Sequence, residues 1–140
     1  MSKSVDFNKY LNFVDGVTSD PSKDYKSFIA SLDHLDREGA DINRLTTAAV
    51  GISAEGGEFM EIVKKMVFQG KPWNDANREH LIVELGDVMW YVAQACMALD
   101  VSFDDVVERN VEKLKARYPV ESSMFTIQKI VEREIYNDCI

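Results

Sequence analysis

Two pairs of acidic residues have a spacing that could hold a metal ion. Glu55 and Glu58 are three residues apart, and Glu84 and Asp87 repeat this spacing further along the chain. Residues three apart on an α-helix lie on the same face, about one turn from each other. If two such helices lie side by side, four carboxylates meet and repel one another unless a cation sits between them. We therefore expect a metal site whose ligands are Glu55, Glu58, Glu84 and Asp87.

The helical period places one member of each pair in an apolar stripe. At about 100° per residue, Glu55 lies within roughly 20° of Ala48 and Met66, and Glu84 is likewise set among apolar neighbours. A buried carboxylate needs a cation nearby or must stay protonated. A solvated acidic face and a salt-bridged structural cluster remain alternatives. Metal binding is favoured because solvated residues should not interrupt two apolar stripes at matching positions.

The ligand types indicate which metal to expect. Four carboxylates with no nearby histidine or cysteine favour a hard ion, Mg²⁺ or Mn²⁺ as a substitute. A di-iron bundle would use Glu-x-x-His pairs, which His34 and His80 do not form, and zinc lacks its usual ligands here. His80 precedes Glu84 by four residues and could approach the site, although a surface position or a place behind the ligands is the favoured interpretation.

The apolar pattern predicts an all-α protein with helices over residues 5–18, 24–37, 41–69, 75–100 and 103–118. Asp41 and Gly70 have the types expected at the start and the end of the third of these helices. Ser102 and Asp105 resemble a capping box, and Pro119 closes the last helix. We expect one domain over 1–140, a four-helix-bundle-like arrangement with a short extra N-terminal helix. Its core covers about 45–119, and 120–140 form a C-terminal extension.

Two features predict close neighbours for the central helices. Gly56 and Gly57 lie inside the helix over 41–69, where each costs about 1 kcal/mol relative to alanine. This suggests close approach by a neighbouring helix or a ligand, with a local kink as the alternative. The helix over 75–100 is apolar almost all the way round, so it must be central or covered by a second subunit. We therefore expect dimerisation through the central helices.

Bulk composition narrows the class of protein. The chain has 140 residues, 46% of them hydrophobic, and a net charge of −8, which argues against a broad basic surface for DNA or RNA. Cys96 and Cys139 are too few for a disulfide framework, and Cys96 is expected to pack in its apolar helix. The N-terminus lacks the apolar stretch of a signal peptide, and no apolar run approaches the ~20 residues of a membrane span. A cytoplasmic protein without a membrane partner is the expectation.

Side chains that could contact phosphate lie on two of the predicted helices. Asn110, Lys113 and Arg117 fall within about 60° of one another on the helix over 103–118. Lys64 and Lys65, near the end of the helix over 41–69, are further candidates. Ordinary solvated charges are the alternative for all of them.

Together these motifs resemble the MazG-like nucleoside triphosphate pyrophosphohydrolases. The likeness runs from about Leu45 to Pro119 and is especially close from Glu79 to Tyr91. The chain departs from the family between Thr18 and Asp41, where it looks longer than compact relatives. It rests on the following residues: Glu55-x-x-Glu58, Glu84-x-x-Asp87, Asn110-x-x-Lys113 and Arg117-Tyr118-Pro119.

The resemblance implies an all-α bundle that forms a homodimer or homotetramer and binds Mg²⁺ at the acidic cluster. It also implies hydrolysis of an often deoxy nucleoside triphosphate to the monophosphate and pyrophosphate. The four carboxylates become metal ligands, and Asn110, Lys113 and Arg117 become triphosphate contacts. A metal-activated water would attack the α-phosphorus, with Glu58 or Glu61 as the general base that orients it.

Other functions remain open from the sequence. Phosphoribosyl-ATP or an alarmone nucleotide could be the substrate of the same chemistry. A catalytically weak regulatory bundle that binds nucleotide or metal, or a helical interaction protein with a solvated acidic face, would belong to different classes. The preferred base and sugar are not indicated by any motif.

Overall fold

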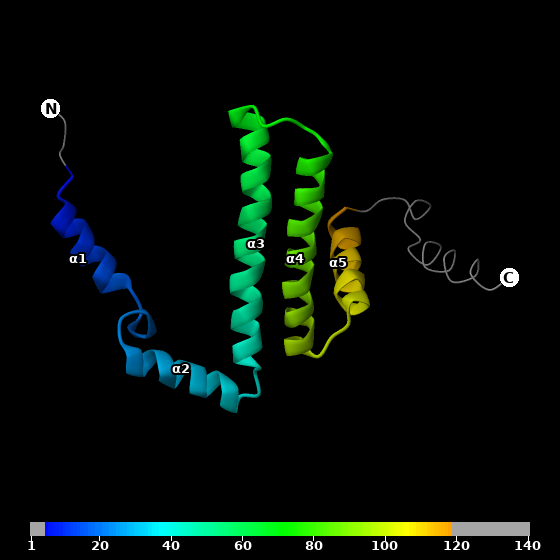
Figure 1. The fold of residues 1–140 in the computed structure, drawn as a ribbon. Helices are drawn as coiled ribbons and strands as arrows, with labels where there is room; N and C mark the ends of the chain where they lie inside the picture. Colours follow the sequence, from blue (N-terminus) through cyan, green and yellow to red (C-terminus); the bar gives the residue numbers. More distant parts are fainter. Residues whose placement is uncertain (1–4, 119–140) are drawn as a thin grey trace. The chain divides into compact units, whose positions relative to one another are not determined.

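In a computed structural model, residues 5–118 are described, and over this range the chain forms α-helices and one short 3₁₀ turn but no strand (Figure 1). The all-α prediction is confirmed. The 3₁₀ turn occupies the expected break between the first two helices. Pro119, Cys139 and the extension 120–140 lie outside the described residues. The elements are α1 Phe7–Val17, η1 Asp20–Ser22, α2 Tyr25–Arg37, α3 Ile42–Gln69, α4 Asp75–Leu99 and α5 Phe103–Arg117.

Polar side chains fix where each α-helix begins. In every case the residue before the helix accepts a hydrogen bond from a backbone N–H of the first turn, which would otherwise lack a partner. Ser102 and Asp105 exchange two such bonds, so the predicted capping box is confirmed. Gly70 ends α3 with a φ of 70°, a left-handed conformation that glycine adopts without strain. The five capping residues are Asp6, Asp24, Asp41, Asn74 and Ser102.

The packed part of the chain is an antiparallel hairpin of α3 and α4, joined by a short loop (Figure 1). Near the open end of the hairpin, Arg44 Nη1 donates a 2.6 Å hydrogen bond to Gln94 Oε1. At the loop end, the buried Asn77 donates from Nδ2 to the carbonyl oxygen of Pro72 at 2.6 Å. The first contact joins the two helices, and the second holds the loop between them against α4.

Close approach of α4 to α3 occurs at a different glycine from those expected. A Cβ added at Gly56 or Gly57 would meet nothing within 4 Å, whereas one at Gly51 would overlap the ring of Tyr91. The expected approach of a neighbouring helix at Gly56 and Gly57 is therefore wrong for this hairpin, because these residues lie about 100° and 200° round the helix from Glu55, which faces α4. Approach by a ligand there stays a prediction.

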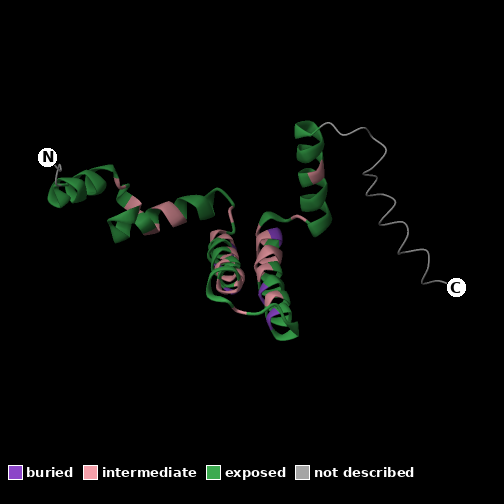
Figure 2. Ribbon diagram, turned by 90° about the horizontal axis from the view of Figure 1, so that it is seen from above, coloured by how far each residue is buried: buried purple, intermediate pink, exposed green. Residues whose placement is uncertain are grey.

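All buried residues of the described chain lie in α3 and α4 (Figure 2), and α3 covers only one side of α4. The predicted burial of Cys96 is confirmed. One side of α4 faces α3, while its other side exposes large apolar side chains. That α4 is central, or is covered by a second subunit, stays a prediction. The exposed side chains, the outer face of α4, are Ile82, Val83, Leu85, Met89, Trp90 and Met97.

The expectation that no apolar run approaches the length of a membrane span is wrong for α4. Its 25 residues include an 18-residue stretch with a mean hydropathy of 1.3, of which 11% is buried. Length and composition alone are weak evidence for a span, because the core helix of a soluble protein shares them. Two acidic residues, Glu84 and Asp87, interrupt the run in the sequence.

The remaining helices contribute little packing. Lys23 Nζ donates a 2.9 Å hydrogen bond to the backbone oxygen of Asp15, which ties the end of α1 to the turn before α2. The helix α2 contacts α3. The contacts divide the chain into two units, one ending at Val101 and one beginning at Ser102, so α5 is described by itself. That residues 1–140 form one domain stays a prediction.

Candidate functional site

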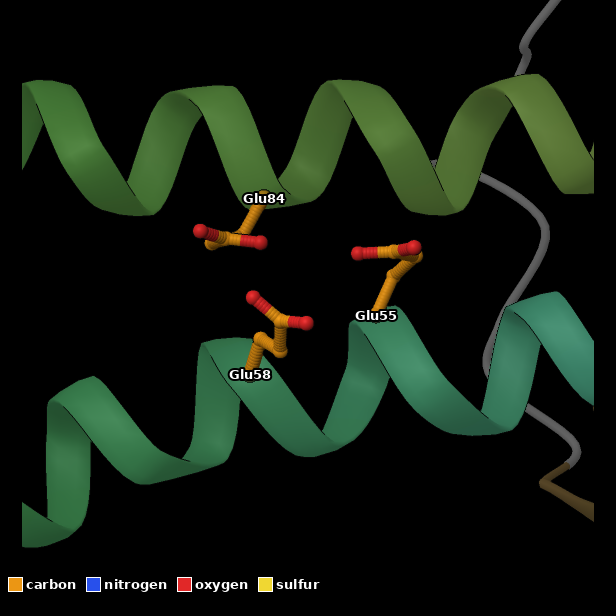
Figure 3. Close-up of side chains that lie close together, drawn as sticks. All are labelled: Glu55, Glu58 and Glu84. Atoms are coloured by element: carbon orange, nitrogen blue, oxygen red, sulfur yellow. The ribbon is translucent and has the colours of Figure 1, made fainter.

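Three glutamates from α3 and α4 converge inside the hairpin. One carboxylate oxygen from each of Glu55, Glu58 and Glu84 lies within 4.8 Å of the others. Figure 3 shows Glu84 reaching from α4 toward the two glutamates of α3. Oxygen ligands on opposite sides of a Mg²⁺ ion are about 4.2 Å apart. Small rotations of the side chains would therefore let all three ligate one cation.

The three glutamates differ in their exposure. Glu84 is the most buried of the three, only 5% exposed, whereas Glu55 is half-buried and Glu58 is exposed. The carboxylate of Glu84 meets His80 Nε2 at 3.0 Å. His80 thus stands next to this carboxylate on the solvent side, one turn earlier on α4. Its i,i+4 spacing from Glu84 was the sequence signal for this contact.

Electrostatic repulsion marks the cluster. Partial burial raises the pKa of the Glu55 carboxyl, and the negative charges of Glu58, Asp87 and Glu84 raise it further. Asp87 is exposed and lies outside the group of three, yet its charge acts on Glu55. The structure therefore brings three of the four predicted ligands together and leaves Asp87 at the rim.

Glu61 is engaged elsewhere. Its Oε1 lies 3.1 Å from Lys65 Nζ, one turn further along α3. The hydrogen bond from Lys65 lowers the pKa of the Glu61 carboxyl, and the charge of Lys64 adds to this effect. Neither Glu61 nor Lys65 joins the group of three. Of the two predicted general bases, only Glu58 lies in the cluster.

The predicted phosphate contacts of the last helix all lie on α5. Asn110, Lys113 and Arg117 are exposed, and the helical period places them on one side of α5. Because α5 is described by itself, contact between these residues and a nucleotide held at the cluster stays a prediction.

The donor set fits a hard divalent cation. All ligand atoms in the group are carboxylate oxygens, which Mg²⁺ and Mn²⁺ accept. Partial burial, and then the neighbouring carboxylates, disfavour the negative charge of Glu55 and raise its pKa, and a cation between the carboxylates would offset this penalty.

Comparisons with known proteins cover the same part of the chain. The sequence model of the MazG nucleotide pyrophosphohydrolase domain matches residues 44–121. The Gene 37 protein of Mycobacterium phage L5 is 42% identical over an alignment of 78 residues, which covers 54% of this chain and 68% of the phage protein. No solved structure matched. The family match contains α4, α5, nearly all of α3 and every predicted ligand and phosphate contact.

Proposed function

Because the chain belongs to the MazG nucleotide pyrophosphohydrolase family, we propose that it hydrolyses (deoxy)nucleoside triphosphates to the monophosphate and pyrophosphate with the help of Mg²⁺. One observation carries the proposal: within the matched segment, carboxylate oxygens of Glu55, Glu58 and Glu84 come within 4.8 Å of one another from two helices. Such a cluster is the kind of ligand set that binds Mg²⁺ together with substrate phosphates.

Each carboxylate has its own part in holding the cation. Glu84, buried against α3, supplies a fixed ligand, and Glu55 supplies a second from the facing helix. Glu58 lies on the open side of the cluster, where the substrate would enter. Asp87, exposed at the rim, would complete the set once the cation and the phosphates draw it in. Mn²⁺ would substitute for Mg²⁺ because both accept oxygen ligands.

When bound, Mg²⁺ would neutralise phosphate charge and make a water molecule more acidic. Glu58 orients that water through an oxygen not used as a ligand and takes up its proton. The water oxygen forms a bond to the α-phosphorus, the bond from this phosphorus to the bridging oxygen breaks, and pyrophosphate leaves. Asn110, Lys113 and Arg117 would stabilise the charge on the triphosphate. Lys65 would join them by leaving Glu61.

We further propose that the active form is a homodimer, or a homotetramer built from two dimers, in which α4 is shared between subunits. The outer face of α4 supports this, since Trp90 is 54% and Leu85 53% exposed in the single chain. Monomeric soluble proteins rarely expose continuous apolar patches of this kind. A nucleotide is then the small-molecule partner, and the cytoplasm is the proposed compartment.

A panel of nucleotides tests the reaction. The full chain is incubated with the common NTPs and dNTPs, with and without Mg²⁺, and the products are separated by ion-exchange chromatography. We expect a monophosphate and pyrophosphate only when Mg²⁺ is present. Glu58→Gln and Asp87→Asn should reduce the rate, because each removes one negative charge from the cluster without changing the size of the side chain.

Three outcomes of this experiment would contradict parts of the proposal. Release of orthophosphate would contradict cleavage at the α-phosphorus. Nucleotide binding without turnover would contradict an enzyme and favour a regulatory bundle. Full activity in EDTA would contradict the cation.

A further inference from the structure

Gly51 lies at a close contact between the two helices of the hairpin. It is buried in α3, and a Cβ added to it would overlap Cγ, Cδ1 and Cε1 of the Tyr91 ring. A Cβ added at any other glycine of the described residues would have no neighbour within 4 Å. At Gly51 the backbone of α3 lies directly against an aromatic ring.

The ring of Tyr91 has little freedom to move aside. Its Cγ is bonded directly to Cβ, so rotation of the ring about χ2 leaves Cγ in place and does not relieve the overlap. The ring also packs edge-on against Trp90, with a centroid distance of 4.8 Å and an interplanar angle of 89°. Side chains in a helix have few allowed χ1 rotamers. A larger residue at position 51 would therefore push α4 away from α3.

This contact lies next to the carboxylates. Gly51 precedes Glu55 by four residues, about 6 Å along α3, and Tyr91 follows Glu84 by seven residues on α4, also on the side that faces α3. Measured from the loop at Gly70, Gly51 is about 28 Å away and Glu55 about 22 Å. If the hairpin opens about that loop, roughly four-fifths of the displacement at Gly51 reaches Glu55.

A divalent ion tolerates little of such a displacement. Mg²⁺ requires near-octahedral ligands at 2.0–2.1 Å, and a working site keeps its distances within about 0.2 Å. We propose that Gly51 and Tyr91 are positioning residues that set the separation of α3 and α4 so that Glu84 reaches the same cation as Glu55 and Glu58. This inference rests on the proposed metal site. Neither residue needs to touch the substrate.

Cation binding to the substrate-free protein tests the inference. The full chain is titrated with Mn²⁺ by isothermal titration calorimetry, well below the melting temperature of every variant, and circular dichroism checks its helix content. Gly51→Ala should bind Mn²⁺ about 10-fold more weakly or worse, the range seen when groups that orient metal ligands are removed. Gly16→Ala is the matched control, since that glycine also lies within a helix and has nothing within 4 Å.

A double variant separates positioning from simple packing. Tyr91→Ala removes Cγ and the ring, so Gly51→Ala combined with Tyr91→Ala no longer contains the overlap. We expect the double variant to bind Mn²⁺ more tightly than Gly51→Ala alone. If the pair only fills space, the double variant will bind no more tightly than the worse single variant.

The outcomes distinguish this inference from the proposed function. Wild-type affinity in Gly51→Ala, or a double variant that binds no more tightly than Gly51→Ala, would overturn the positioning role and leave the metal site standing. A wild-type protein that binds no Mn²⁺ would overturn the metal site and this inference with it.

Discussion

The two faces of α4 differ in which residue types they bury, and the pattern is unlike that of an ordinary core helix. On the face toward α3, the most deeply buried residues include a carboxylate, Glu84, and an amide, Asn77. On the opposite face, Leu85, Met89 and Trp90 remain about half exposed. A carboxylate is thus buried among the apolar residues of the inner face, while large apolar side chains stay exposed on the outer face. Folded proteins usually bury apolar side chains and expose ionised ones, because removing apolar surface from water is favourable and removing an ionised group is costly.

This inversion shows what the isolated hairpin lacks. The large apolar side chains of the outer face are already about half covered, so covering the rest would contribute about 1 kcal/mol each, roughly half of the value for full burial. The inner carboxylates repel one another, and a cation would turn this repulsion into attraction. A second subunit and a metal ion would therefore stabilise the two faces independently. A substitution aimed at one face therefore tests that face by its own measurement, metal-dependent activity or subunit association.

The largest effect is expected on the inner face. Glu84→Gln keeps the size of the side chain but removes the buried ligand charge, so pyrophosphate release should fall by at least about 100-fold, beyond the loss seen when groups behind metal ligands are removed. Initial rates with the best nucleotide of the panel measure this. Glu79→Gln, the same change at an exposed position of α4, should keep wild-type rates. A Glu84→Gln enzyme with more than a tenth of the activity would contradict the site.

The next effect concerns the outer face. Trp90→Glu places a charge in the apolar patch, and the loss of a central aromatic residue from an interface costs about 2 kcal/mol or more, which is about 30-fold in the dissociation constant. Sedimentation equilibrium should show a dimer for the wild type and mainly monomer for the variant. Trp73→Glu makes the same change in the loop before α4, where Trp73 is also exposed. If both variants sediment as the wild type does, the outer face is not the interface.

Much of this arrangement follows from local sequence patterns. Capping residues such as Ser102 and Gly70 determine helix ends through bonds within a few residues, so the boundaries could be predicted closely. The helical period also placed Glu55 and Glu84 on the faces that meet. These features depend on a single helix at a time.

The remaining features depend on how two elements meet. Gly51, and not Gly56 or Gly57, contacts α4 because the rotation and register of the hairpin select it. The pairing of Glu61 with Lys65 was open to prediction from its i,i+4 spacing, but the choice of this partner over the cluster depends on side-chain rotamers. The approach of Lys113 and Arg117 to a substrate depends on contacts beyond the helix that carries them.

A smaller effect is expected at His80, which stands beside the buried ligand. In His80→Ala, the Glu84 carboxylate loses its contact, at a cost of about 1–3 kcal/mol in the metal-free protein. Melting followed by circular dichroism in EDTA should show that the melting temperature of the variant is several degrees below that of the wild type. With saturating Mg²⁺ the decrease should be smaller, because the cation compensates the same charge. Equal decreases in both conditions would mean that His80 and the cation do not act on the same carboxylate.

The smallest effect is expected from Glu55, whose pKa in the folded protein lies above the ordinary value of 4.5 because of burial and of the charges of Glu58, Asp87 and Glu84. Between the two pKa values the folded state holds more protons than the unfolded state. Stability from this group is therefore complete below pH 4.5 and is lost as the pH rises through the folded-state pKa. Glu55→Gln removes this loss, so without metal the variant should melt at an increasingly higher temperature than the wild type as the pH rises from 4.5 toward 7.

The same substitution should have the opposite effect once Mg²⁺ is added. The wild type then gains a ligand charge for the cation that the variant lacks, and binding to the folded state alone raises its melting temperature. Melting curves of both proteins in EDTA and in saturating Mg²⁺, at pH 5 and pH 7, test this reversal. A Glu55→Gln protein that melts below the wild type in EDTA at pH 7 would show that the inner face is not strained by its own charges. The contrast between the two faces of α4 would then rest on exposure alone.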